Sequence, residues 1–167
     1  MIEFTIYPED VKKYSIEIKV EGDWVSFRHH DYSPYSASKK AGRYNHDGDT
    51  AYYLASGYDV AKAEVPNWED MNPYKVEPAT IHAFNVAQWS QNNGTYDEFL
   101  KSKEQGGHGF CQKITDQLTG MYGVSAILYN SQPMYESGKT GCCLVVLPLS
   151  GQLIGETFFA KDNEFKG

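Results

Sequence analysis

The stretch TAYYLASGYDVAKAEVP, residues 50–66, carries the clearest fold signal in the chain. Its first six residues form a short apolar run, which predicts a strand. Ser56 is a residue type that caps helix starts, and the residues after it favour a helix that Pro66 ends. The stretch therefore predicts a strand that passes through a turn into a helix.

Strands and helices are expected on both sides of this unit. Apolar patterns predict strands at residues 3–7, 15–20, 24–29, 125–129 and 143–147, and the last of these is continuously apolar, as a central strand would be. Helical spacing is found at residues 95–103 and 110–122. Polar residues dominate 31–49 and 130–140, which are expected to be loops. The pattern indicates a mixed α/β or α+β domain around a central sheet.

Composition limits the classes of function that the chain can have. The 167 residues carry 15 Lys and Arg against 22 Asp and Glu, a net charge of −7, which disfavours binding to nucleic acid. The length fits one domain, expected at residues 1–155, with 156–167 as a C-terminal tail. The three cysteines are an odd number and two are adjacent, which favours a reducing compartment. No signal peptide or membrane-length apolar run is evident, so we expect a cytoplasmic protein without membrane contact.

Common catalytic motifs are absent or incomplete. The five histidines and three cysteines show no HExxH or CxxC spacing, so no metal site is expected. Residues 137–140, SGKT, resemble the end of a phosphate-binding loop, but a strand follows where that loop needs a helix, so a turn is the better interpretation. Residues 123–127 lack the second glycine of a hydrolase nucleophile elbow.

Four polar residues stand out, and each has two interpretations. Arg43 lies in a polar, glycine-containing loop, where it is either an anion clamp or a solvated surface residue. Glu64 follows Val60 by one helical turn, so its carboxylate either lies on a buried stripe or reaches solvent at the helix edge. Arg28 lies in a half-buried strand, where it is functional or protects a sheet edge. Ser131 follows an apolar strand, where it serves an active site or an ordinary turn.

Taken in order, these residues belong to a series of short motifs. The series is FR at 27–28, AGRYN at 41–45, TAYYLA at 50–55, VAKAE at 60–64 and ILYNS at 127–131. Together they resemble the RES domain, named for its arginine, glutamate and serine, across residues 24–147. The resemblance implies an α+β fold related to the ADP-ribosyltransferases, with a mixed, mainly antiparallel central sheet and flanking helices.

The same resemblance implies a function. RES proteins are known as toxins that deplete NAD, so it implies cleavage of the bond between nicotinamide and ribose, with NAD as substrate and no resident cofactor. The acceptor would be water or phosphate. The alternatives are a mono-ADP-ribosyltransferase that modifies a protein, and a nucleotide-binding module without turnover. A toxin also implies a separate antitoxin or immunity protein that blocks the active site. The toxin would act in the cytoplasm of the producing cell, or of a target cell if it is delivered as an effector. The oligomeric state stays open.

Residue roles are implied motif by motif. Two arginines would bind the pyrophosphate, a tyrosine would orient the nicotinamide ribose, a glutamate would act at the scissile bond and a serine would orient the substrate. A carboxylate beside a developing positive ribose, with cations holding the diphosphate, suits a transition state that resembles an oxocarbenium ion. These catalytic residues are Arg28, Arg43, Tyr53, Glu64 and Ser131, and the additional substrate contacts are Tyr44 and Asn45.

Overall fold

The computed structural model describes residues 5–20, 24–29, 43–46, 51–65, 67–75, 78–101 and 109–147, without the side chains of residues 27–29 and 72. Its helices are α1 (Pro8–Tyr14), α2 (Tyr58–Glu64), the 3-10 turn η1 (Trp68–Asp70), α3 (Val86–Asn92), α4 (Tyr96–Leu100), α5 (Gly109–Tyr122) and α6 (Gln132–Glu136). Its strands are β1 (Ser15–Val20), β2 (Val25–His29), β3 (Tyr52–Ala55), β4 (Met71–Lys75), β5 (Ala79–Asn85), β6 (Ala126–Asn130) and β7 (Cys142–Val146).

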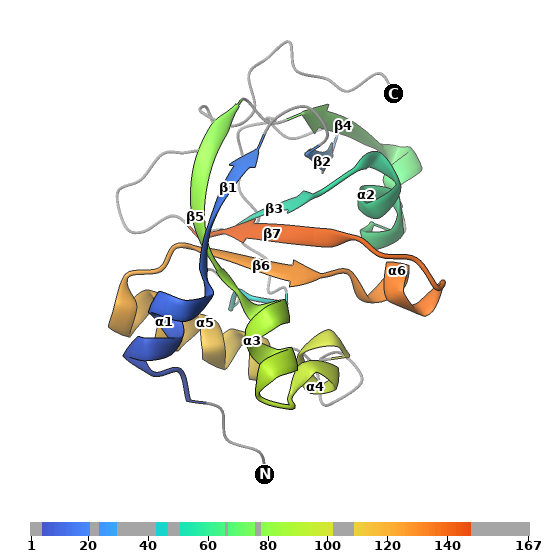
Figure 1. Ribbon diagram of the computed structural model, residues 1–167. Coiled ribbons are helices and arrows are strands. Elements are labelled where there is room, and N and C mark those ends of the chain that lie inside the picture. The colour runs from blue at the N-terminus through green and yellow to red at the C-terminus, as the bar shows by residue number, and fades with distance from the viewer. Residues whose placement is uncertain are drawn as a thin grey trace.

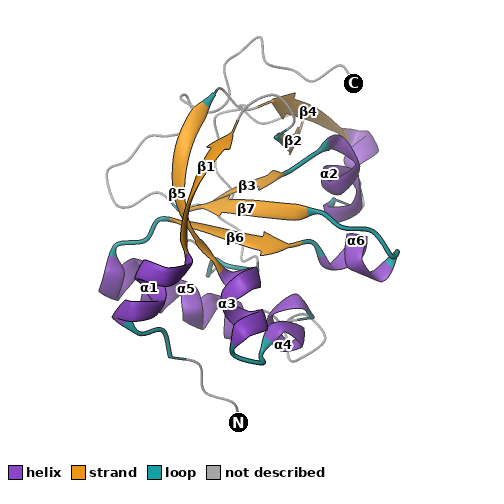
Figure 2. Ribbon diagram, viewed as in Figure 1, coloured by secondary structure: helices purple, strands orange, loops and turns teal. Residues whose placement is uncertain are grey.

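The described strands form one seven-stranded sheet in the order β1-β5-β6-β7-β3-β2-β4. Only the β5–β6 pair is parallel, and the other pairs are antiparallel. Figure 1 shows α1, α3, α4 and α5 gathered on one side of the molecule, while α2 and α6 lie at the end of the central strands. Figure 2 shows the strands together in orange, with the helices in purple below them and at the right end of the central strands. The prediction of an α+β fold with a mixed, mainly antiparallel sheet and flanking helices is confirmed.

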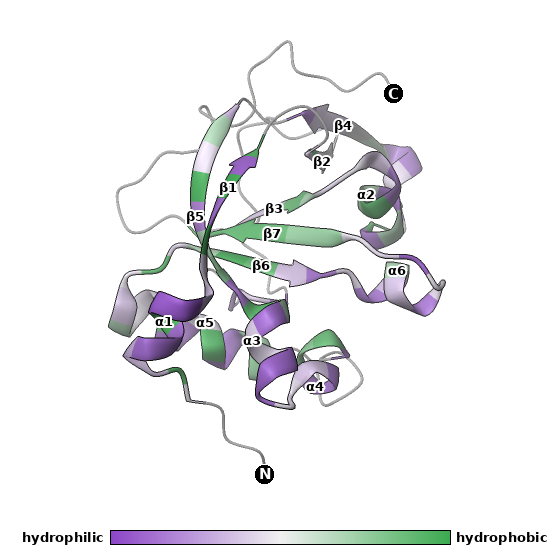
Figure 3. Ribbon diagram, viewed as in Figure 1, coloured by the Kyte–Doolittle hydropathy of each residue, from purple (hydrophilic) through white to green (hydrophobic). Residues whose placement is uncertain are grey.

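The core lies between the sheet and the helices. β7 is apolar along its whole length (Figure 3). It has a neighbouring strand on each side, and four of its five residues are buried, as expected for a central strand. α5 is amphipathic and buries Cys111, Ile114, Thr115 and Leu118 at the spacing of one helical face. A second apolar cluster, which includes Leu54, Leu144 and Val146, lies on the other face of the sheet.

Several predicted elements are wrong or were missed. Residues 5–7 are not a strand, and the helix after them begins with Pro8, a residue favoured in the first turn. The loop predicted at 130–140 contains α6, a short helix capped by the Ser131 side chain. Ser56 is not the cap of α2, because Gly57 has that position and the Ser56 hydroxyl accepts from Cys142 N at 3.2 Å. The sequence patterns predict no element for the segment that forms β4, β5 and α3.

Gly141 sets the distance between α2 and α6. A Cβ at this position would lie 2.6 Å from Cγ2 of Val60 and 3.3 Å from Cγ of Met134. We expect Gly141→Ala to lower the free energy of unfolding by about 1–3 kcal/mol through overpacking, measured by urea denaturation. Gly109→Ala is the control, since a Cβ there meets no atom within 4 Å. Equal stability of Gly141→Ala and the wild type would contradict this packing.

Candidate active site

Arg43 is one of only two arginines in the chain, and backbone carbonyls surround its guanidinium. Nη1 donates to the carbonyl of Asn130 at 3.2 Å, and Nη2 donates to the carbonyls of Phe99 and, at 3.0 Å, Leu100. Arg43 thereby connects the end of α4 to the end of β6. Among the described residues its hydrogen-bond partners are neutral, so its positive charge is not neutralised by a carboxylate there. Such a cation suits an anionic ligand.

Two tyrosine rings enclose the same guanidinium. The carbon of the Arg43 guanidinium lies 4.8 Å from the centre of the Tyr129 ring and 5.6 Å from that of Tyr44. The two rings also contact one another, with centroids 4.7 Å apart. Burial lowers the pKa of the Arg43 guanidinium, but Tyr44, Cys111 and Tyr129 together raise it by more, so it lies above its usual value. The guanidinium is charged at every pH at which the protein is folded.

Tyr53 holds the segment that carries Arg43. Its hydroxyl accepts from the backbone N–H of Tyr44 at 3.0 Å and donates to Oδ1 of Asn45 at 2.6 Å. Both Tyr44 and Asn45 are almost completely buried. Gln112 of α5 donates from Nε2 to the Asn45 carbonyl at 3.1 Å. The segment 43–46 is therefore fixed by hydrogen bonds from β3 on one side and from α5 on the other.

Glu64 ends α2 and approaches the same region. α2 packs on β2, β3 and α6. The pKa values of Tyr129 and Cys143 are raised well above their usual values, and burial is the largest cause. The negative charge of the Glu64 carboxylate raises both pKa values further. Arg43 acts on both groups in the opposite direction. Arg43 and Glu64 therefore both lie near the same pair of buried side chains.

Three buried side-chain atoms without a hydrogen-bond partner lie in this region. They are Nε of Arg43, the hydroxyl oxygen of Tyr44 and Oε1 of Glu64, and the described part of the chain has no other such atom. A buried polar atom without a partner costs about 1–3 kcal/mol, more when it is charged. Each such atom calls for an explanation, and a catalytic or ligand-binding role is one. Their concentration here marks this region as the candidate active site.

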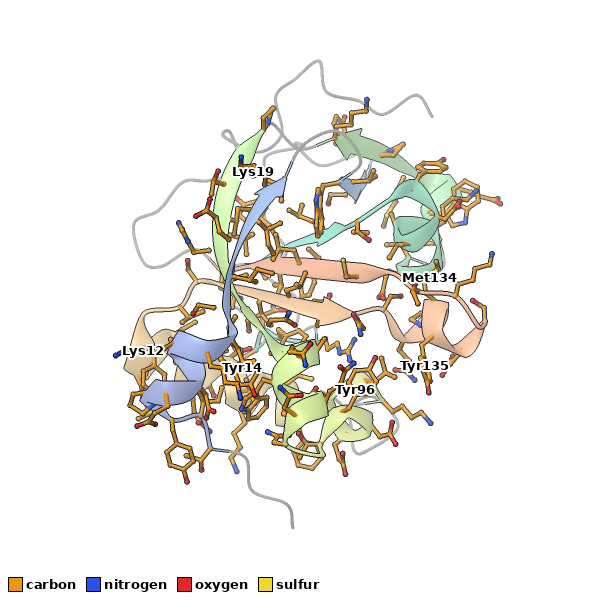
Figure 4. The ribbon with its side chains drawn as sticks, in the orientation of Figure 1. Lys12, Tyr14, Lys19, Tyr96, Met134 and Tyr135 are labelled. Carbon is orange, nitrogen blue, oxygen red and sulfur yellow. The ribbon has the colours of Figure 1, made fainter. Side chains whose placement is uncertain are left out.

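Ser131 and Arg28 complete the predicted set. Ser131 follows β6, is 1% exposed, and its hydroxyl accepts from Met134 N at 3.4 Å as the cap of α6. The preceding residue, Asn130, binds Arg43 through its carbonyl and donates from its side chain to the Tyr96 hydroxyl at 2.8 Å. Tyr96 lies at the start of α4 (Figure 4). Arg28 lies in β2, opposite Asn72 of β4, and its side chain is outside the described residues.

Sequence reasoning assigned no role to Tyr129, Cys143 or Gln112. Tyr129 lies within the ILYNS motif, on a strand where alternate residues face the helices, so its position was a usable signal. Cys143 begins a continuously apolar run, which predicts a buried strand and gives no sign of a functional residue. Gln112 lies on the predicted amphipathic helix, and nothing local shows that it reaches residue 45, which is 67 positions away.

A pocket opens beside Arg43, on the side of α3 and α4. Its volume is only about 10 Å³, and its lining includes Arg43, Tyr96, Phe99, Tyr129 and Asn130. Pockets for whole small molecules have about 300–1,000 Å³, and a single water needs about 10–15 Å³. In this structure the pocket is therefore about the size of one water molecule, and a dinucleotide would need space beyond it.

The buried tyrosines make stability depend on alkaline pH. Burial raises the pKa of Tyr53 to about 12, from an ordinary value of 10. Burial also raises the pKa values of Tyr44, Tyr129 and the Cys143 thiol. A raised pKa stabilises the fold fully below the ordinary value, and this contribution is lost as the pH rises through the raised value.

We therefore expect the free energy of unfolding to fall as the pH rises from 9 to 12, measured by urea denaturation at each pH. In Tyr53→Phe the fall between pH 10 and 12 is expected to be smaller, because one of the titrating groups is gone. Tyr135→Phe is the control, because Tyr135 is exposed. An identical pH dependence in Tyr53→Phe and the wild type would contradict the burial of a neutral Tyr53.

Comparison with known proteins gives a match in fold but none in sequence. No protein family and no curated protein matches the chain. A chain in the crystal structure of the M. tuberculosis MbcT–MbcA toxin–antitoxin complex matches with a TM-score of 0.58 at 11% identity, over 90% of this chain and 86% of that one. The two chains share a fold. The predicted likeness is thus confirmed at the level of fold.

Two further features of the structure concern membranes and metals. Among the described residues no helix is both long and apolar enough to cross a bilayer. Within the same part of the chain no three His, Cys, Asp or Glu side chains gather where they could hold a metal ion.

Proposed function

We propose that this protein is a RES toxin that depletes NAD by breaking the bond between nicotinamide and ribose. The observation that supports the proposal is that Arg43, Tyr44 and Glu64 each carry a buried polar atom without a hydrogen-bond partner, and that Arg43 and Glu64 both act on the buried Tyr129 and Cys143. The fold shared with a chain of a toxin–antitoxin complex supports the toxin role. The RES motifs support NAD as the substrate.

The chemistry needs few groups, and this site has them. Nicotinamide leaves as a neutral pyridine, so its departure needs no general acid, and the positive charge moves to the ribose. An ionised Glu64 carboxylate stabilises that charge, and a positive group such as Arg43 holds the diphosphate. Water then adds to the ribose carbon and releases a proton, which gives ADP-ribose. Phosphate in place of water gives the phosphorylated product.

The other predicted residues support these two groups. Tyr53 holds the Arg43 segment through Tyr44 and Asn45. Ser131 caps α6 next to the Asn130 carbonyl that binds Arg43. In this proposal Arg28 supplies a second cation from β2.

A toxin needs an inhibitor in the cell that makes it. We propose a separate antitoxin that covers the region of Arg43 and Glu64, because the positive charge of Arg43 between two tyrosine rings suits an acidic or aromatic side chain from a partner. The structural neighbour comes from a complex of a toxin with its antitoxin, which supports this arrangement.

Expression in a bacterial host tests the proposal. We expect induction of the wild-type protein to lower the cellular NAD pool at least about tenfold and to stop growth, while induction of Glu64→Gln leaves both unchanged. The NAD pool is measured by an enzymatic cycling assay, and equal expression is checked by immunoblot. Growth arrest with an intact NAD pool would contradict NAD depletion and favour modification of a protein target.

A further inference from the structure

α5 presents two side chains, one helical turn apart, to the segment 43–46. Gln112 Nε2 donates to the Asn45 carbonyl at 3.1 Å, and Asp116, four residues later, pairs with Nε2 of His46 at 2.9 Å. Residues at this spacing lie on the same face of a helix. The His46–Asp116 pair is exposed on both sides, and such pairs contribute little. Gln112 is half-buried and binds a carbonyl of a nearly completely buried residue, so its bond is the stronger anchor.

The opposite side of the segment is held by Tyr53. Its hydroxyl binds the Tyr44 N–H and the Asn45 side chain, while Gln112 binds the Asn45 main chain. Arg43 directly precedes these residues, and its guanidinium must reach three carbonyls that lie on two other elements. A shift of the segment would therefore move the guanidinium away from its place.

We propose that Gln112 is a positioning residue that acts through Arg43. Gln112 keeps the segment 43–46 at the distance from β3 at which the Arg43 guanidinium lies between Tyr44 and Tyr129. This inference rests on the proposed function, because it assigns Arg43 to the binding of a diphosphate. It adds a residue that lies outside all the RES motifs and that no substrate needs to touch.

Gln112→Met tests the inference, since methionine keeps the length of the side chain and removes the donor. We expect KM for NAD and the Kd for ADP-ribose to rise about 3- to 10-fold, the effect of one lost hydrogen bond, with kcat within about twofold of the wild type. Gln117→Met is the matched control. Gln117 lies on the same helix, is equally half-buried and accepts from Ile6 N at 2.8 Å, but it holds the N-terminal segment instead. Equal KM and Kd in the two variants would overturn the proposal.

Two further measurements separate positioning from general destabilisation. In an Arg43→Lys background, Gln112→Met is expected to leave the Kd for ADP-ribose within about twofold, because both changes act on the same group. A full additional loss in that background would mean that Gln112 acts by another route and would overturn the proposal. Hydrogen exchange at the Tyr44 amide measures local opening of the segment 43–46 and needs no catalytic activity. We expect faster exchange in Gln112→Met than in Gln117→Met.

The outcomes for the two proposals differ. A wild-type protein that neither cleaves NAD nor binds ADP-ribose contradicts the proposed function, whatever the exchange rates are. A wild-type protein that cleaves NAD, together with a Gln112→Met variant that matches Gln117→Met in KM, Kd and Tyr44 exchange, contradicts the role of Gln112 alone.

Discussion

Glu64→Gln is expected to lower the rate of nicotinamide release by at least about 100-fold. The amide has the shape of the carboxylate but no charge to stabilise a positive ribose in the transition state. The effect should fall on kcat, because the charge on the ribose develops only during the reaction. The measurement is steady-state kinetics with chromatographic detection of nicotinamide.

The same substitution is expected to lower activity without lowering stability. Oε1 of Glu64 is buried without a hydrogen-bond partner, so the amide of glutamine loses no hydrogen bond at this atom. We expect Glu64→Gln to unfold at the same or a higher temperature than the wild type. Glu69→Gln is the control, since Glu69 lies five residues later and is exposed, and it should leave both rate and stability unchanged. A Glu64→Gln protein that is folded and fully active would contradict the role of this carboxylate.

Arg43→Lys is expected to reduce kcat/KM by about 100-fold or more, mainly through KM. Lysine keeps the positive charge, but one ammonium group cannot reproduce the planar donors that bind the carbonyls of Phe99, Leu100 and Asn130. The carbonyls left without a donor also lower the free energy of unfolding by about 2–4 kcal/mol. Kinetics and urea denaturation measure the two effects separately.

Lys113→Met is the charge control for this variant. Lys113 is exposed on α5, so Lys113→Met removes one positive charge from the protein without changing Arg43. If binding of NAD depended only on the net charge of the protein, Lys113→Met would weaken binding and Arg43→Lys would not. That result would contradict the account of Arg43 as a geometrically fixed diphosphate ligand.

Long, strongly patterned elements could be predicted from the sequence, and short ones could not. The apolar run that forms β7 and the spaced apolar residues of α5 identified both elements to within one or two residues. α6 has five residues and forms because Ser131 caps it and β6 delivers the chain to the right place. β5 passes directly into α3 at Asn85, so no turn residues mark the boundary. Tertiary contacts decide such elements, and a local pattern does not contain them.

The candidate site shows the same division. The motifs indicated Arg43, Tyr53 and Glu64 by residue type, and the structure places all three around Tyr129 and its neighbours. The sequence left open whether Arg43 is solvated, and only the folded chain shows that its partners are carbonyls from residues 56, 57 and 87 positions away. Contacts at such separations depend on the topology of the sheet, which no local motif encodes.

The most direct test of the central claim is to incubate purified protein, free of bound inhibitor, with NAD and to separate the products by chromatography. We expect nicotinamide and ADP-ribose in equal amounts, or nicotinamide and phosphorylated ADP-ribose when phosphate is the acceptor. Glu64→Gln in the same assay shows whether this site is responsible. A folded wild-type protein that releases no nicotinamide under either condition would contradict NAD cleavage.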